Sequence, residues 1–180
     1  MIFVTVGAQM PFDRLIGWVD EWAVARERRD FSAQTGPSDL VPRALEPVPF
    51  LDPRAFRQHM ESADAVVAHA GMGTILTALE LGKPILVVPR LGARNETRND
   101  HQVATAEHFA KEGLVLAAYD EAGFALQMTR LDAEIESRLE GGSYEPRIGA
   151  RGSDSLLARL REFAVGESWP PPGEAEGAES

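Results

Sequence analysis

The chain has 180 residues, of which 44% are apolar, contains no cysteine and carries a formal net charge of −10 at pH 7. Without cysteine it forms no disulfide, thiolate metal site or thiol nucleophile. The acidic excess argues against non-specific binding to nucleic acid, which needs a basic surface, but backbone dipoles still allow one phosphorylated small molecule to bind. No apolar run approaches the roughly 20 residues of a membrane span, and the first residues lack the basic flank of a signal peptide. We therefore expect a cytoplasmic protein.

The first third of the chain predicts strands that alternate with helices. The opening apolar, β-branched run stops at Gly7, which indicates a buried strand. Asp52 followed by Pro53 is typical of a helix start. The elements expected up to residue 63 are strands at 2–6, 30–35 and 48–51, helices at 12–23 and 52–63, and a proline-rich loop over 35–49.

The alternation continues through the rest of the chain. Gly82 and Gly113 are expected to end helices, as glycine often does. The tail 166–180 is rich in Pro, Gly and Glu and is expected to be disordered, which leaves one domain over 1–165. The other elements expected are strands at 64–70, 84–89 and 114–118, helices at 74–81, 100–113, 121–140 and 154–165, a polar loop at 90–99 and a linker at 141–152.

This order of elements predicts an α/β fold, a Rossmann-like, doubly wound parallel sheet with helices on both faces. Ligands of such sheets bind at the carboxyl ends of the strands. Gly7 and the segment 69–74 both fall at that edge, so the site is expected there.

The segment His69-Ala70-Gly71-Met72-Gly73-Thr74 lies between a predicted strand and a predicted helix. A helix start carries unpaired amides and about half a positive charge, and it therefore attracts phosphate. Glycines let the backbone approach such a ligand, although they also serve in a tight turn that binds nothing. The sequence contains no P-loop, no dinucleotide fingerprint and no Gly-x-Ser-x-Gly elbow. The four histidines lack zinc-protease spacing, and we expect no metal.

Three stretches carry a family resemblance: "TVGAQMPFDRLI", "HAGMGTILTALELGKPILVVPRL" and "NETRNDHQVATAEHF". In order and spacing, over residues 1–118, they resemble the C-terminal, nucleotide-sugar-binding half of a GT-B glycosyltransferase of family 28. The pattern is most similar to the small catalytic subunits of split UDP-GlcNAc and exopolysaccharide glycosyltransferases. The resemblance implies a donor-binding hexosyltransferase subunit.

The resemblance also implies which residues hold the donor. The matching positions are Gly7, Ala8, Gly71, Met72, Gly73 and Thr74 for the diphosphate, Phe50 and Leu51 for the base, and Asp100 and Gln102 for the sugar hydroxyls. The family's ribose-binding acid is replaced here by Thr77, and Glu80 follows three residues later. Residues at that spacing lie close to one helical turn apart. Asp100 is also a suitable N-cap for the helix that follows it.

The resemblance implies transfer from a UDP-sugar, UDP-GlcNAc or another hexose donor, to a lipid-linked acceptor in surface polysaccharide synthesis. No metal or other cofactor is implied, because a helix N-terminus stabilises the departing diphosphate. Residue 1 already begins the donor-binding half, so we expect a membrane-associated partner subunit to supply the acceptor site, the general base and the membrane anchor. His101 and His69 are candidate bases within this chain, but a structural role is favoured for both.

Other interpretations remain open at this point. The chain is alternatively a non-catalytic nucleotide-sugar-binding or assembly module, with Thr77 marking lost chemistry, or a GT-B-like epimerase. Arg90, Arg94 and Arg98 either close over the phosphates or belong to a solvated loop. The stripe Leu126, Leu131, Ile135 and Leu139 is expected to be core or a face that docks the partner.

Overall fold

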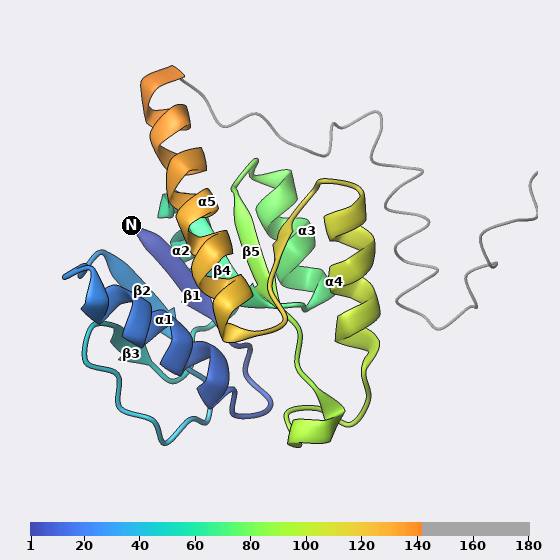
Figure 1. Ribbon diagram of the computed structural model, residues 1–180. Helices are drawn as coiled ribbons and strands as arrows, with labels where there is room; N and C mark the ends of the chain where they lie inside the picture. Colours follow the sequence, from blue (N-terminus) through green and yellow to red (C-terminus); the bar gives the residue numbers. More distant parts are fainter. Residues whose placement is uncertain (142–180) are drawn as a thin grey trace, which may run out of the picture. The chain divides into compact units, whose positions relative to one another are not determined.

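A computed structural model describes residues 1–141, which form an all-parallel sheet of six strands with helices on both faces (Figure 1). The strands are β1 Ile2–Thr5, β2 Phe31–Gln34, β3 Glu46–Val48, β4 Ala65–His69, β5 Ile85–Val88 and β6 Leu116–Ala117. The helices are α1 Asp13–Ala25, α2 Pro53–Ser62, α3 Met72–Glu80, the 3₁₀ turn η1 Gly92–Arg94, α4 His101–Lys111 and α5 Glu121–Gly141.

The strand order is β3-β2-β1-β4-β5-β6. The chain builds outward from β1 to β3, returns beside β1 with β4, and then builds outward in the other direction. This confirms the predicted doubly wound sheet and places its topological switch point between β1 and β4. At such a point the loops that follow the two strands diverge to opposite faces and leave a crevice between them.

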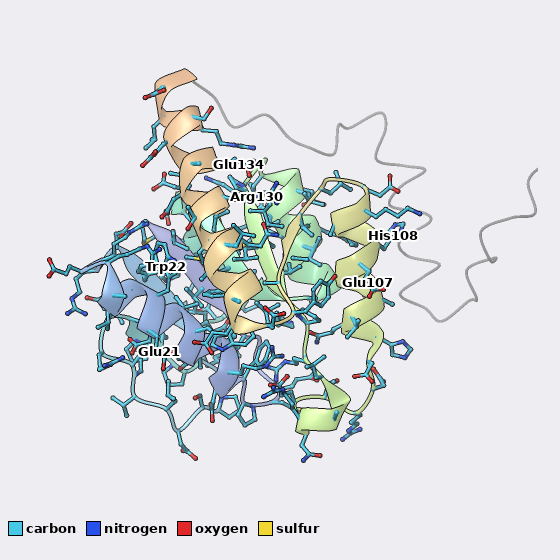
Figure 2. The ribbon with its side chains drawn as sticks, viewed as in Figure 1. Glu21, Trp22, Glu107, His108, Arg130 and Glu134 are labelled. Carbon is cyan, nitrogen blue, oxygen red and sulfur yellow. The ribbon has the colours of Figure 1, made fainter. Side chains whose placement is uncertain are left out.

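The core lies on both faces of this sheet. One face packs against α1 and α5, which Figure 1 shows in front of the strands, and a Trp18–Phe124 ring contact at 5.6 Å joins the two helices. The opposite face packs against α2, where the ring of Phe3 stacks on His59 with centroids 5.2 Å apart. Figure 2 shows α1, with Glu21 and Trp22 labelled, and α4, with Glu107 and His108 labelled, beside opposite halves of the sheet. Burial on both faces explains why strands such as β5 show no polar alternation.

The predicted helix signals are confirmed in three places. Asp52 caps α2, since its carboxylate accepts a hydrogen bond from the Ala55 amide at 2.8 Å, and Pro53 takes the first helical position. Gly82 and Gly113 follow the ends of α3 and α4 with φ of +66° and +68°. That conformation suits glycine and is strained for other residues.

Most boundaries differ from the prediction by one or two residues, and two of the differences concern predicted site residues. The strand expected at 48–51 is instead β3 at Glu46–Val48, because its pairing partner β2 ends at Gln34, which lies opposite Val48. Phe50 and Leu51 therefore lie beyond the strand. Helix α3 begins at Met72 rather than Thr74, with Gly71 at the N-cap, so Gly73 belongs to the helix.

Helix α5 uses only part of its predicted apolar stripe. Leu131 is buried and Ile135 packs against the core, but Leu126 and Leu139 are 62% and 70% exposed. Three predicted segments lie outside the described residues: the linker at 141–152 (except residue 141), the helix at 154–165 and the tail at 166–180. Among residues 1–141, no helix combines the length and the apolar character needed to cross a bilayer.

Candidate functional site

A pocket of about 370 Å³ opens at the carboxyl edge of the sheet, at the switch point between β1 and β4. Its walls come from the chain after β1, from the end of β4, and from the segment between β5 and α4. The lining residues are Val6, Gly7, Ala8, Gln9, Met10, His69, Arg90, Glu96, Thr97 and Gln102. Segments that are far apart in the sequence thus meet at the edge where the glycine patterns predicted a ligand.

The N-terminus of α3 lies at this edge without a capping side chain. The N-cap residue is Gly71, which has no side chain, and the first turn carries no acidic residue. Its amides and the positive end of the helix dipole are therefore available to an anion. Thr74, also in the first turn, is buried with 8% of its surface exposed.

Gly73 has open space around it. A Cβ built at this position meets no atom within 4 Å apart from its chain neighbours and the backbone of its own helix. Glycine also disfavours a helix by up to about 1 kcal/mol relative to alanine, so neither local propensity nor packing accounts for its presence. The glycine at position 73 is explained if a ligand approaches the backbone closely there.

His69 lies between the two glycine segments. A Cβ on Gly71 would come within 2.3 Å of its Nε2, and a Cβ on Gly7 within 3.1 Å of its Cε1. Its Nδ1 is buried and makes no well-formed hydrogen bond to the described part of the chain. Burial, helped by the Arg90 charge and opposed by the Thr5 main chain, lowers the pKa of His69 to about 4. The ring is therefore neutral at pH 7 and lines the pocket without a charge.

The Gly7 loop, residues 6–11, begins where β1 ends. Gly7 has φ +76°, and its amide donates a hydrogen bond to the Thr5 hydroxyl at 3.3 Å. The Thr5 hydroxyl in turn donates to the Gln34 side chain at the end of β2, at 2.8 Å. These buried polar contacts fix the start of the loop, and Ala8 and Gln9 beyond it are exposed beside the pocket.

Arg90 follows β5 and is buried, with 5% of its surface exposed. Its guanidinium donates to the carbonyls of Val6 at 2.7 Å, Met10 at 2.7 Å, Pro11 at 2.6 Å and Glu96 at 3.0 Å. This residue therefore belongs to a buried main-chain network and not to a solvated loop. Arg94 and Arg98, by contrast, are exposed.

Glu96 anchors the segment between β5 and α4. Its carboxylate accepts two hydrogen bonds from the Arg14 guanidinium, both at 2.7 Å, and one from the Leu91 amide at 2.9 Å. The side chains of Arg14 and Glu96 are only 9% and 11% exposed. A buried, bidentate pair of this kind holds the pocket wall against α1.

Of the predicted sugar-binding pair, only Gln102 lines the pocket. Its Oε1 accepts a hydrogen bond from the Arg90 amide at 3.2 Å. Asp100 is exposed and is not among the lining residues. It occupies the N-cap position of α4 but makes no side-chain cap, because its carboxylate accepts from the Gly92 amide at 2.7 Å.

The remaining predicted positions lie outside the pocket lining, and these include the four diphosphate positions at the start of α3, Gly71, Met72, Gly73 and Thr74. Phe50 is 64% exposed and Leu51 is half-buried. The Thr77 hydroxyl donates a hydrogen bond to the Gly73 carbonyl at 2.8 Å. Glu80 and His101 are exposed.

Several lining residues did not stand out in the sequence, namely Gln9, Met10, Glu96 and Thr97. His69 was predicted to be structural, and it both packs against the glycine segments and lines the pocket. A histidine between a buried strand and two glycines was the signal available for it. Within residues 1–141, no group of three or more His, Asp or Glu side chains is placed to hold a metal ion.

Comparison with known proteins places this geometry in a family. The family described as "Glycosyltransferase family 28 C-terminal domain" matches residues 1–143. The mouse (Mus musculus) UDP-N-acetylglucosamine transferase subunit ALG13 is 32% identical over 121 residues, which cover 62% of this chain and 10% of the mouse protein. The matched region therefore spans about a tenth of that relative.

Two solved structures share the fold. The NMR solution structure of ALG13 superposes with a TM-score of 0.57 at 19% identity, covering 88% of this chain and 93% of that one. A UDP-GlcNAc 2-epimerase from Neisseria meningitidis, bound to UDP-GlcNAc, gives a TM-score of 0.55 at 19% identity over 91% of this chain and 43% of the epimerase. The same fold thus occurs in a transferase subunit and in an epimerase, so the activity has to be argued from the site.

Proposed function

Since the chain belongs to the glycosyltransferase family 28 C-terminal domain family, we propose that it is the donor-binding subunit of a two-component hexosyltransferase. The donor is a UDP-sugar, UDP-GlcNAc or another UDP-hexose. The acceptor is lipid-linked and belongs to surface polysaccharide synthesis. The observation that carries the proposal is the open N-terminus of α3 at Gly73, beside a pocket at the switch point of the sheet.

In this mechanism the donor diphosphate lies against the first amides of α3 and against Gly7 and Ala8. The acceptor hydroxyl attacks the anomeric carbon in line, the bond from that carbon to the diphosphate oxygen breaks, and the nucleoside diphosphate leaves. The helix dipole and fixed amides stabilise the negative charge that develops on the leaving group. This arrangement works without a metal ion.

The sugar and the nucleoside extend from the diphosphate in different directions. Gln102 lines the pocket and retains its amide N–H groups for sugar hydroxyls, because only its Oε1 is engaged by Arg90. The resemblance pairs Asp100 with Gln102 as the second sugar contact; in the structure its carboxylate accepts from the Gly92 amide. We propose, from the family resemblance, that Phe50 and Leu51 meet the base and that Thr77 or Glu80 meets the ribose.

The general base is proposed to come from a membrane-associated partner that binds the acceptor. The neutral, half-buried His69 lines the pocket, and His101 is exposed outside the pocket lining. Support for a partner comes from the mouse and human relatives, which are named as transferase subunits. The chain would then work in the cytoplasm, held at the membrane by that partner.

Calorimetric titration of the chain with UDP, GDP and ADP, with and without magnesium, tests the donor site. We expect selective UDP binding that is independent of magnesium and lost in Gly73→Asp, whose carboxylate repels the diphosphate. No binding by the chain alone or with its co-expressed partner would contradict the proposal. UDP binding without sugar transfer by the complex would favour the non-catalytic alternative.

A further inference from the structure

Arg90 is a buried cation that lines the pocket. Three of the four carbonyls that its side chain engages, those of Val6, Met10 and Pro11, belong to the Gly7 loop, and the fourth belongs to Glu96. We propose that Arg90 is a positioning residue, which holds the Gly7 loop in the shape that donor binding requires. This inference rests on the proposed function for its consequence, but the loop geometry can be tested without a donor.

The hydrogen-bond count of the guanidinium supports a bracing role over phosphate binding. Nη1 donates to Pro11 and Glu96, and Nη2 donates to Val6 and Met10. Each of these nitrogens carries two N–H groups, so all four N–H groups donate to main-chain carbonyls. A bidentate grip on a phosphate would require the side chain to release the loop.

The surroundings fix the guanidinium in this position. It lies over the Phe12 ring, 4.6 Å from the centroid, and Phe12 directly follows the loop. The main-chain amide of the same residue donates to Gln102 on α4. Arg90 therefore connects the Gly7 loop through its side chain with Gln102 through its main chain, which are two walls of one pocket.

A lysine cannot replace this arrangement. Its three donors radiate from one nitrogen, whereas the four carbonyls meet a planar fork with two separated nitrogens. The positive charge would survive the substitution but the geometry would not. Arg90→Lys therefore separates a role of charge from a role of positioning.

The first measurement is the ¹⁵N backbone order parameter of Ala8, Gln9 and Met10. In the wild-type chain we expect values of about 0.85, typical of rigid backbone, and in Arg90→Lys values below about 0.6. Strand amides should keep their values in both. Gly17→Ala, which places a methyl in open space on α1, supplies a stabilised background that keeps the variant folded.

The second measurement is UDP affinity, with Lys83→Gln as the matched control. Lys83 is also a buried cation that donates to main-chain carbonyls, those of Glu61 and Ala63, but it lies before β5 at the amino edge of the sheet. We expect the dissociation constant to rise at least tenfold in Arg90→Lys and to stay within about twofold in Lys83→Gln.

Two outcomes would overturn the inference. One is a folded Arg90→Lys variant whose Gly7 loop stays as rigid as in the wild type. The other is a loss of affinity equal to that of Lys83→Gln, which would reduce Arg90 to a general contributor to stability. If the wild-type chain and its complex bind no UDP, the donor-site proposal fails, while the order parameters still decide whether Arg90 braces the loop.

Discussion

At the residue scale, Gly71 and Gly73 lie two positions apart in opposite surroundings. Gly71 is pressed against the His69 ring, and Gly73 faces open space. The same amino acid thus serves packing at the first position and, in our proposal, ligand approach at the second. Alanine substitutions at the two sites should therefore have opposite effects on stability.

Gly73→Ala should stabilise the chain and weaken donor binding. Apart from its chain neighbours and the backbone of its own helix, the new methyl meets no atom within 4 Å, and alanine favours a helix over glycine by up to about 1 kcal/mol. Urea denaturation should show the gain, and titration with UDP should show a loss of about tenfold, because the methyl lies where the diphosphate approaches. Gly17→Ala is the matched control, with similar gain and unchanged UDP affinity. Equal UDP affinity in Gly73→Ala would argue against a close approach at that amide.

Gly71→Ala should destabilise the chain, because its methyl would come within 2.3 Å of the His69 Nε2. Forcing an extra methyl into a packed region typically costs about 1–3 kcal/mol. Urea denaturation of Gly71→Ala, His69→Ala and the double variant forms a cycle that isolates the contact. In the His69→Ala background, Gly71→Ala should lower the free energy of unfolding by much less than it does in the wild type. Strict additivity of the two single effects would contradict the clash.

At the element scale, Asp52 and Asp100 occupy equivalent N-cap positions with different roles. Asp52 bonds to the Ala55 amide inside its own helix, whereas Asp100 bonds to Gly92 across the loop. Local sequence gave both the same helix-start signal. The difference arises because η1 brings the Gly92 amide close to Asp100, a contact eight residues away that no capping pattern encodes.

Asp52→Ala should lower the free energy of unfolding by about 1 kcal/mol, the usual effect of losing an N-cap. Thermal or urea denaturation measures the change. Asp52→Asn is the conservative control and should retain most of the stability, since its side-chain oxygen still accepts from Ala55. A loss equal in both variants would indicate that the carboxylate charge, rather than the hydrogen bond, stabilises α2.

At the scale of the whole molecule, the neutral His69 makes folding depend on pH. In the unfolded chain a histidine titrates near 6.5, whereas burial, followed by the Arg90 charge, lowers the pKa of His69 to about 4 when folded. Between these values the unfolded state binds the extra proton, so stability is complete above pH 6.5 and decreases as the pH falls toward 4. The loss by pH 4 is about 3 kcal/mol by linkage.

Urea denaturation between pH 4 and 7 measures this effect, with His69→Gln as the control. The wild type contains 28 acidic residues that also titrate at the acid end, so the informative quantity is the difference between the two curves. That difference should narrow from pH 6.5 to pH 4. Parallel curves would show that His69 is protonated in the folded state at the same pH as in the unfolded chain.

Much of the fold was readable from local pattern. The apolar strand runs, the Asp52-Pro53 helix start and the glycines after α3 and α4 act within a few residues, and each was confirmed. The strand at 48–51 was wrong because its bounds depend on pairing with β2, which ends at Gln34 opposite Val48. The exposed Leu126 and Leu139 likewise show that a helical stripe does not reveal how wide a face its neighbours cover.

Periodicity and turn chemistry act locally, so the alternating elements, the doubly wound sheet and the edge that holds Gly7 and the 69–74 segment could be predicted from the amino-acid order. The roles of Arg90, Glu96 and Asp100 became visible only in the folded chain. Their partners lie across 79 or more positions for Arg90 with the Gly7 loop, and across 82 for Glu96 with Arg14. A charged side chain in a loop has the same local signature whether it faces water or braces a pocket. What distinguishes the two is the set of carbonyls and carboxylates that folding brings to it.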